Sequence, residues 1–375
     1  MIYLDYSATT PVNEEVLESY VKACKLYPGN PNSLHKLGIE AKNMIEKATN
    51  QIASLMNVKP EEIIYTSGAS ESNNLALKGI CMMYQNRGKH IITTDLEHSS
   101  IYGPLDYLVK QGFEVSYVRM NSDGRVDLKH LKELIRDDTV LVTVCAVNSE
   151  LGVMQPISEI GELLYNYPKC YFHVDMTQAI GKINIDCSKV DLASFSAHKF
   201  FGLKGIGVLI KKERFEIEPC IHGGKSTTKY RSGTPSLPLI TSLAKALRLA
   251  SINLKSEYDY VFELNQLLRV GLSKYKNVRI NSPMNAIPHI LNISILGVKP
   301  ETMLHALEEY DIYISTKSAC SSSNSESRAV YAHTKDMERA TTSLRISISK
   351  LTTKEEINSF LDKFDVCYNK LTNLR

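Results

Sequence analysis

Two charged residues that follow short apolar runs could do chemistry together. Asp175 follows the run at 171–174, and Lys199 follows a second run at 190–197, directly after His198. Strands bring such residues to one edge of an α/β sheet, where these folds bind ligands. A carboxylate can keep a pyridine nitrogen protonated, and a lysine amine can condense with an aldehyde. The pair suits a pyridinium cofactor, although a single Asp and Lys can equally be a buried ion-pair partner and a surface loop residue.

A segment of small residues is suited to binding an anion. Residues 67–71 (SGASE) follow a short strand expected at 63–65 and precede a helix. Backbone N–H groups at a helix start attract phosphate, and the helix dipole adds to this attraction. A plain helix N-cap is the alternative. We favour phosphate binding because of the motifs that accompany this segment.

Three further residues could take part in a reaction. His98 follows a strand expected at 90–94, where its ring could lie over an aromatic cofactor, although a lone His is more often structural. Cys320 lies in a Ser-rich stretch with almost no apolar neighbours, which favours an accessible, ionisable thiol over a packed one. Arg345 alternates with apolar residues of an expected strand, so it needs either a substrate carboxylate or a structural carboxylate as partner.

Composition narrows the class of protein. The 375 residues are 43% hydrophobic and 23% charged, which is typical of a soluble globular protein with one large or two ordinary domains. A net charge of +3 gives no case for nucleic acid or a membrane as a main partner. The sequence has neither a long apolar stretch nor a signal-peptide pattern. The eight cysteines lack metal-ligand spacing, so we expect no metal site and reduced thiols in a cytoplasmic protein.

The order of the expected elements predicts an α/β fold. Strands and helices alternate up to residue 211, which predicts a large, mainly parallel sheet covered by helices on both faces. The strand at 206–211 is expected to be antiparallel, because its connection is too short for a helical crossover. One long helix is expected from residue 239 toward 276. We place a large domain at 16–250 and a small α+β domain, which carries the Cys320 loop, at 1–15 and 251–375.

Separate motifs over nearly the whole chain carry a family resemblance. They are LDYSATTP at 4–11, GNPNSLH at 29–35, YTSGASESNN at 65–74, EHSS at 97–100, HVDMTQ at 173–178, SFSAHKFFGLKGIG at 194–207, RSGT at 231–234 and SACSSS at 318–323. In this order they resemble the NifS/IscS-type cysteine desulfurases, which are pyridoxal phosphate (PLP) enzymes among the class V aminotransferases. The resemblance implies the fold type I of PLP-dependent transferases, with PLP as cofactor.

The resemblance also implies roles for single residues in catalysis and substrate binding. Lys199 is the lysine that binds the cofactor aldehyde and moves the substrate proton, and His98 stacks on the cofactor ring and relays protons. Cys320 accepts sulfur. Arg345 binds the substrate carboxylate, and Asn30 approaches the substrate.

Other residues are implied to hold the cofactor. Asp175 faces the pyridine nitrogen, and Gln178 reaches the ring hydroxyl. Ser149 contacts cofactor or substrate, and Thr234 reaches the phosphate in the other subunit of a homodimer. The phosphate is surrounded by Ala69, Ser70, Ser196 and His198.

The implied reaction converts L-cysteine to L-alanine and a persulfide on Cys320. The sulfur then passes to an acceptor protein for iron–sulfur cluster assembly or tRNA thiolation, with no direct contact to nucleic acid or membrane. About 25 residues separate Cys320 from Arg345, as in the long-loop form of the family. The alternatives are a related enzyme, such as a selenocysteine lyase, aminotransferase or racemase, and a weakly active sulfur-relay subunit. Ser149, Lys225 and Lys317 depart from the family pattern and leave the rate and the acceptor open.

Overall fold

The computed structural model describes residues 1–316 and 326–372. The predictions for Cys320 and Lys317 fall outside the described residues. Within those residues, no helix combines the length and the apolar character that a membrane crossing requires.

The larger sheet contains seven strands of the described chain, in the order β2-β8-β7-β6-β5-β3-β4. Their bounds are β2 (Ile63–Thr66), β3 (His90–Thr93), β4 (Glu114–Tyr117), β5 (Thr139–Cys145), β6 (Tyr171–Asp175), β7 (Leu192–Ser196) and β8 (Gly207–Lys211). Strand β8 is antiparallel to both of its neighbours, and the other pairs are parallel. The predicted mainly parallel sheet and its antiparallel strand are therefore confirmed.

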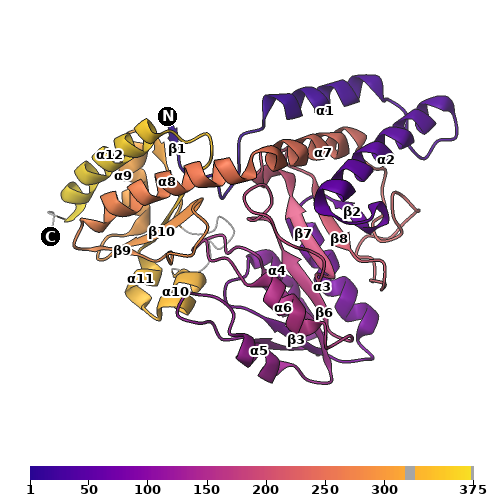
Figure 1. The fold of residues 1–375 in the computed structure, drawn as a ribbon, viewed down its shortest axis with the longest axis horizontal. Coiled ribbons are helices and arrows are strands. Elements are labelled where there is room, and N and C mark those ends of the chain that lie inside the picture. The colour runs from indigo at the N-terminus through magenta and orange to yellow at the C-terminus, as the bar shows by residue number, and fades with distance from the viewer. Residues whose placement is uncertain (317–325, 373–375) are drawn as a thin grey trace.

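Helices cover both faces of this sheet (Figure 1). Side chains alternate along each strand, so that Ile63 and Tyr65 pack into one hydrophobic cluster and Ile64 packs into the other. The first cluster includes α1 (Glu14–Leu26), α2 (Lys36–Met56), α5 (Leu128–Leu134), α6 (Ile157–Leu164) and α7 (Leu237–Ile252). The second includes α3 (Ala69–Tyr84) and α4 (Ser99–Lys110). Strands buried on both faces explain the continuous apolar runs of the sequence.

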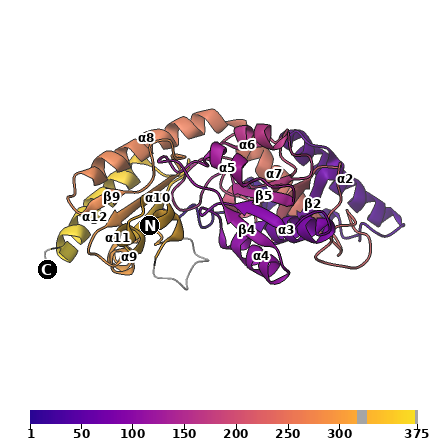
Figure 2. The same cartoon turned by 90° about the horizontal axis from the view of Figure 1, so that it is seen from below.

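A smaller α+β part has its own hydrophobic core. Its antiparallel sheet has the order β12-β10-β9, and β1 pairs with β11 in parallel. The strands are β1 (Ile2–Tyr3), β9 (Val278–Ile280), β10 (Ile290–Ile295), β11 (Ile312–Tyr313) and β12 (Ser343–Ser347). The helices are α8 (Leu254–Ser273), α9 (Pro300–Glu308), α10 (Arg328–Thr334), α11 (Met337–Thr341) and α12 (Lys354–Thr372). Figure 2 shows the two parts side by side.

The prediction of a single long helix from residue 239 toward 276 is wrong. The structure has two helices, α7 and α8, which meet at Asn253 with a backbone (φ −123°, ψ 31°) outside the helical region. They run end to end and join the two parts of the molecule (Figure 1). The break has a packing reason, because α7 buries its apolar face in the large core and α8 buries its own in the small core. The domain boundary expected after residue 250 falls in the last turn of α7 and stays a prediction.

The chain at residues 4–10, here called the N-terminal arm, runs from the small part to the large one. Leu4 N donates to Tyr313 O at 2.8 Å, and Ser7 N donates to Ser347 Oγ at 2.9 Å. Thr10 N then donates to His198 O at 2.9 Å. The arm therefore links β11 and β12 to the segment that follows β7, and it crosses the edge of the large sheet on its way.

Candidate active site

A cavity of about 430 Å³ opens where the parallel strands of the large sheet end. The N-terminal arm and Arg345 of β12 close it from the side of the small part. Polar and charged side chains from segments far apart in the sequence meet here, as the fold rule for open α/β sheets predicts. Ten of the residues singled out from the sequence line this cavity: Ala69, Ser70, His98, Ser149, Asp175, Gln178, Ser196, His198, Lys199 and Arg345.

Two predicted site residues in the described part of the chain do not line it. Thr234 lines a neighbouring cavity of about 120 Å³ together with Ser67 and Gly205. Asn30 is exposed in the loop before α2, where its side chain accepts a hydrogen bond from Asn32 N at 2.9 Å. Cys320 is outside the described residues. The roles of these three residues stay predictions.

Asp175 is a buried carboxylate at the end of β6, with 5% of its surface exposed. Its Oδ2 accepts a hydrogen bond from Asn73 Nδ2 at 2.8 Å, and its Oδ1 accepts one from Thr177 N at 2.9 Å. Both of these donors are neutral. A buried carboxylate that faces a cavity with neutral donors alone favours a cationic ligand atom, because burial penalises an uncompensated charge. The site can hold a protonated ring nitrogen.

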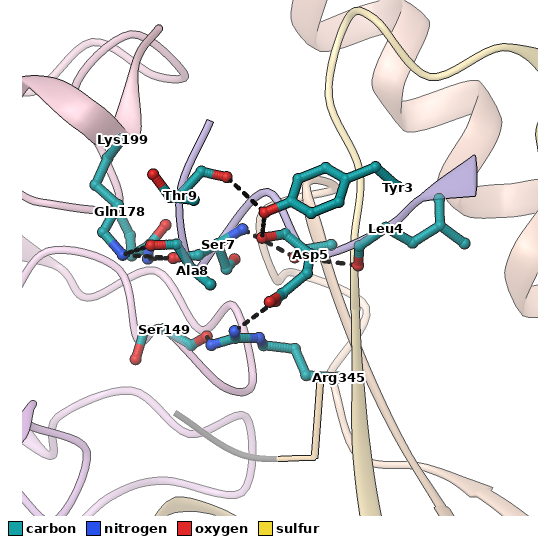
Figure 3. A network of polar contacts seen from close by, with 11 residues as sticks. Tyr3, Leu4, Asp5, Ser7, Ala8, Thr9, Ser149, Gln178, Lys199 and Arg345 are labelled. Atoms are coloured by element: carbon teal, nitrogen blue, oxygen red, sulfur yellow. Dashed lines mark hydrogen bonds and ion pairs between the residues drawn. The ribbon is translucent and has the colours of Figure 1, made fainter. Parts of the chain in front are cut away.

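Lys199 lies in the short 3-10 helix η2 (Ala197–Lys199) directly after β7. Its Nζ donates to Ser7 O at 2.6 Å and to Ala8 O at 2.8 Å, both in the N-terminal arm (Figure 3). These two backbone carbonyls orient the amine. The arrangement places a primary amine in the cavity, where it can reach a carbonyl carbon or a proton.

The start of α3 forms an anion cradle. Gly68 precedes the helix and has no side chain to cap its first turn, while Ser67 N donates to Glu71 Oε2 at 2.7 Å. A Cβ on Gly207 would lie 2.6 Å from the Gly68 Cα, so glycine at 207 permits β8 to approach the loop. Ser70 and Ser196 line the same end of the cavity with their hydroxyl groups. Free N–H groups and the helix dipole make this end suited to phosphate.

Two histidines line the cavity. His98 Nδ1 accepts a hydrogen bond from Ser100 N at 3.1 Å, so Nε2 is the ring nitrogen left to contact a ligand. Burial, together with the positive charges of Lys199 and Lys204, lowers the pKa of His198 to about 4. His198 therefore acts at neutral pH as a hydrogen-bonding group rather than as a cation.

A neutral acid lies behind the cavity wall, and a neutral thiol lines the cavity. Burial, together with the nearby charge of Asp175, raises the pKa of Glu97 to about 8. Its Oε1 accepts hydrogen bonds from Thr94 Oγ1 at 2.7 Å and from Cys145 N at 3.0 Å. Burial, with the charges of Glu97 and Asp175, also raises the pKa of the Cys145 thiol well above its usual value. Cys145 lines the cavity, but it is not a thiolate at neutral pH.

Arg345 presents a guanidinium to the cavity from β12, with 2% of its surface exposed. Its Nη2 pairs with Asp5 Oδ1 at 2.8 Å, and its Nη1 donates to Ser149 O at 3.0 Å (Figure 3). Its Nε has no hydrogen-bond partner within the described part of the chain. The guanidinium is thus held from two sides and keeps donor capacity for an anion.

Several residues of this site were not singled out from the sequence. Asp5 and Ser7 lie within the motif at 4–11, and Asn73 lies within the motif at 65–74, but neither motif indicated their contacts. The arm contacts Lys199 through backbone carbonyls, and a backbone contact does not depend on the residue type that a sequence shows. The motif at 4–11 was the available signal for a role of the arm.

The three parts of the cavity together fit one kind of group. The cradle of α3 suits a phosphate, Asp175 suits a protonated aromatic nitrogen, and Lys199 suits an aldehyde. Thr177 Oγ1, which is buried and has no hydrogen-bond partner among the described residues, adds a further polar atom at the wall. A phosphorylated pyridine aldehyde therefore fits the residues that are present.

Comparison with known proteins agrees with this chemistry. The family model described as aminotransferase class-V matches residues 2–360. The chain belongs to this family. Among class-V relatives, a NifS/IcsS protein homolog of Lactobacillus delbrueckii subsp. bulgaricus is 40% identical over 380 residues, covering 100% of this chain and 99% of its own. The cysteine desulfurase IscS of Dictyoglomus turgidum is 38% identical over 378 residues, covering 100% of this chain and 96% of its own.

Solved structures of similar class-V proteins share the whole fold. A NifS-like protein superposes with a TM-score of 0.93 at 36% identity, covering 99% of this chain and 100% of its own. A structure described as SspA in complex with cysteine superposes with a TM-score of 0.82 at 32% identity, covering 94% of this chain and 100% of its own. The fold predicted from the resemblance is confirmed.

Proposed function

We propose that this protein is a PLP-dependent cysteine desulfurase, which converts L-cysteine to L-alanine and leaves the sulfur as a persulfide on Cys320. One observation carries the proposal: a single cavity brings together the Lys199 amine, the buried Asp175 carboxylate, the uncapped start of α3 and the Arg345 guanidinium. The full-length similarity to proteins named cysteine desulfurase supports the substrate.

The cofactor would be held by residues on three sides of the cavity. Bound PLP supplies an electron sink that stabilises negative charge at the substrate Cα. Asp175 would hold the pyridine nitrogen in its protonated form, Gln178 would donate to the ring hydroxyl, and His98 would lie against the ring. The phosphate would lie at the start of α3, in contact with Ala69, Ser70, Ser196 and His198.

Lys199 and Arg345 would handle the substrate. Arg345 binds the carboxylate of L-cysteine through the donors that Asp5 and Ser149 leave free. Lys199 Nζ takes the proton from the substrate Cα and later gives a proton back, since it is the amine that the arm holds inside the cavity. Both groups come from rigid elements, which keeps their separation constant during the reaction.

Cys320 would complete the reaction as a nucleophile. Its thiolate attacks the substrate Sγ, the bond between Cβ and Sγ breaks with its electron pair on Cβ, and a proton on Cβ completes L-alanine. The new S–S bond leaves a persulfide on Cys320. Among the described cysteines, Cys145 lines the cavity, and its raised thiol pKa does not suit this role.

The biological setting follows from the same proposal. A second copy of the chain would bring Thr234 to the phosphate, and an iron–sulfur scaffold or a tRNA-thiolating enzyme would accept the sulfur. Seven cysteines of the described residues are free thiols, which supports the reducing cytoplasm as the compartment. Analytical ultracentrifugation of the PLP-loaded protein tests the dimer.

Replacement of Arg345 by lysine is expected to raise the KM for L-cysteine by about 10- to 100-fold, with a smaller change in kcat. A lysine cannot bind Asp5, Ser149 O and a carboxylate at once, because it lacks the planar fork of arginine. Steady-state kinetics with L-cysteine measure both constants. The control is Arg339→Lys, since Arg339 is half-buried and donates to Asn281 Oδ1 and Ile280 O outside the cavity. An unchanged KM in Arg345→Lys would contradict the role.

The proposed function is tested by incubating the purified, PLP-loaded protein with L-cysteine and a reductant. We expect alanine and sulfide in equal amounts, and a yellow protein before substrate is added. L-selenocysteine and an amino acid paired with a keto acid acceptor are assayed beside it. A strong preference for selenocysteine, transamination without sulfide, or a protein that fails to bind PLP would each overturn the proposal.

A further inference from the structure

A buried lysine that the proposed mechanism does not use lies directly behind the cavity. Lys182 lies in the turn that follows β6, and 8% of its surface is exposed. Its Nζ donates to Gln178 Oε1 at 3.0 Å and to Gln178 O at 3.2 Å. The ion pairs found among the described residues do not include this amine, which is unusual for a lysine so deeply buried. Burial of the protonated amine therefore has a cost in free energy.

Lys182 determines which way the amide of Gln178 points. An ammonium group has donors and no acceptor, so the amide oxygen must face it and the amide nitrogen must face away. Gln178 Nε2 accordingly donates to Ser7 O at 2.9 Å, and the same carbonyl accepts from Lys199 Nζ at 2.6 Å (Figure 3). A continuous chain of hydrogen bonds therefore leads from the Lys182 ammonium to the reactive amine.

The charges around Lys182 are mainly positive. Burial, together with the positive charges of Lys199 and Arg345, lowers the pKa of Lys182 to about 7. Two histidines are also close enough to be influenced by it, His198 and His289, and burial keeps both of them neutral at pH 7. Asp5 pairs with Arg345. The positive charges that act on Lys182 favour a ligand that brings an ionised oxygen to Gln178.

We propose that Lys182 is a positioning residue that orients the Gln178 amide with its N–H groups toward the cavity and so favours the ionised form of the cofactor's ring hydroxyl. This inference rests on the proposed function, because it assumes PLP as the ligand. The alternative is a purely structural role, in which Lys182 only closes the turn after β6 through the Gln178 carbonyl.

The test is a pH titration of the visible absorption band of the PLP-loaded protein, with pyridoxal phosphate as the probe. In Lys182→Met we expect the midpoint of the yellow-to-colourless change to rise by about one pH unit. Loss of a nearby positive charge favours the protonated, yellow form, and loss of the amide donor at the ring oxygen acts in the same direction. A purely structural role would lower the melting temperature and leave the midpoint in place.

Matched variants separate the charge from the fold. Lys211 is a second buried lysine whose amine donates to the backbone carbonyls of Lys212 and Phe215, at the far end of β8. Lys211→Met should keep the wild-type midpoint. Lys182→Gln, which keeps a donor but no charge, should raise the midpoint, and Lys182→Arg should restore it. If neither neutral variant folds, a raised midpoint in the folded arginine variant would still overturn the proposal, as would an unshifted Lys182→Met.

The failure of this inference can be told apart from failure of the proposed function. A wild-type protein that stays colourless with PLP, or that releases no sulfide from L-cysteine, overturns the function itself. A yellow, active wild type whose midpoint equals that of Lys182→Met overturns the role of Lys182 alone.

Discussion

Replacement of Lys199 by alanine is expected to lower the release of alanine and sulfide from L-cysteine by at least about 10³-fold. The variant removes the amine that the carbonyls of Ser7 and Ala8 hold inside the cavity. No other lysine of the described residues is placed to take over: Lys182 faces Gln178, and Lys204 is exposed at the rim. The Cα proton of the substrate then has no base.

The same variant should still bind PLP, because the anion cradle and Asp175 are untouched. We expect the cofactor to be retained without a covalent link, so that borohydride treatment followed by mass spectrometry finds no cofactor attached to the chain. The wild type should retain it on the peptide that contains Lys199. The control is Lys110→Ala, since Lys110 is exposed at the end of α4. Sustained turnover in Lys199→Ala would contradict the assignment.

Replacement of Cys320 by alanine is expected to abolish persulfide formation and to reduce sulfide release to the background level, while the protein stays yellow. The prediction follows from the chemistry of the cysteines that the structure does describe. Burial raises the thiol pKa of Cys81, Cys145, Cys170 and Cys187, and none of them can serve as a thiolate at neutral pH. A nucleophile is nevertheless required to take the substrate sulfur.

The measurement is mass spectrometry of the protein after one turnover with L-cysteine, which detects one extra sulfur atom on the Cys320 peptide. Cys220→Ser is the control, because Cys220 is an exposed thiol outside the cavity. Cys145→Ala tests the competing assignment, since Cys145 is the described cysteine that lines the cavity. Sulfur found on Cys145, or a persulfide that persists in Cys320→Ala, would show that the assignment to Cys320 is wrong.

Much of the fold could be predicted from the sequence for local reasons. Buried strands read as continuous apolar runs, and the short connection before β8 was enough to make that strand antiparallel. The junction of α7 and α8 could not be predicted in the same way. Both helices continue an amphipathic pattern, and the break at Asn253 depends on two separate cores that only the folded chain defines.

The candidate site also has features that the sequence predicts and features that only the folded chain shows. Asp175, Lys199 and His98 follow strands, so the sequence by itself determined that they would meet at one edge of the sheet, and the motifs determined the chemistry to look for. The tertiary structure alone decided the partners of these groups. It placed the arm carbonyls on Lys199, Asp5 on Arg345 and Lys182 behind Gln178. Such contacts join residues up to 340 positions apart, some of them through the backbone, and no local pattern in a sequence records them.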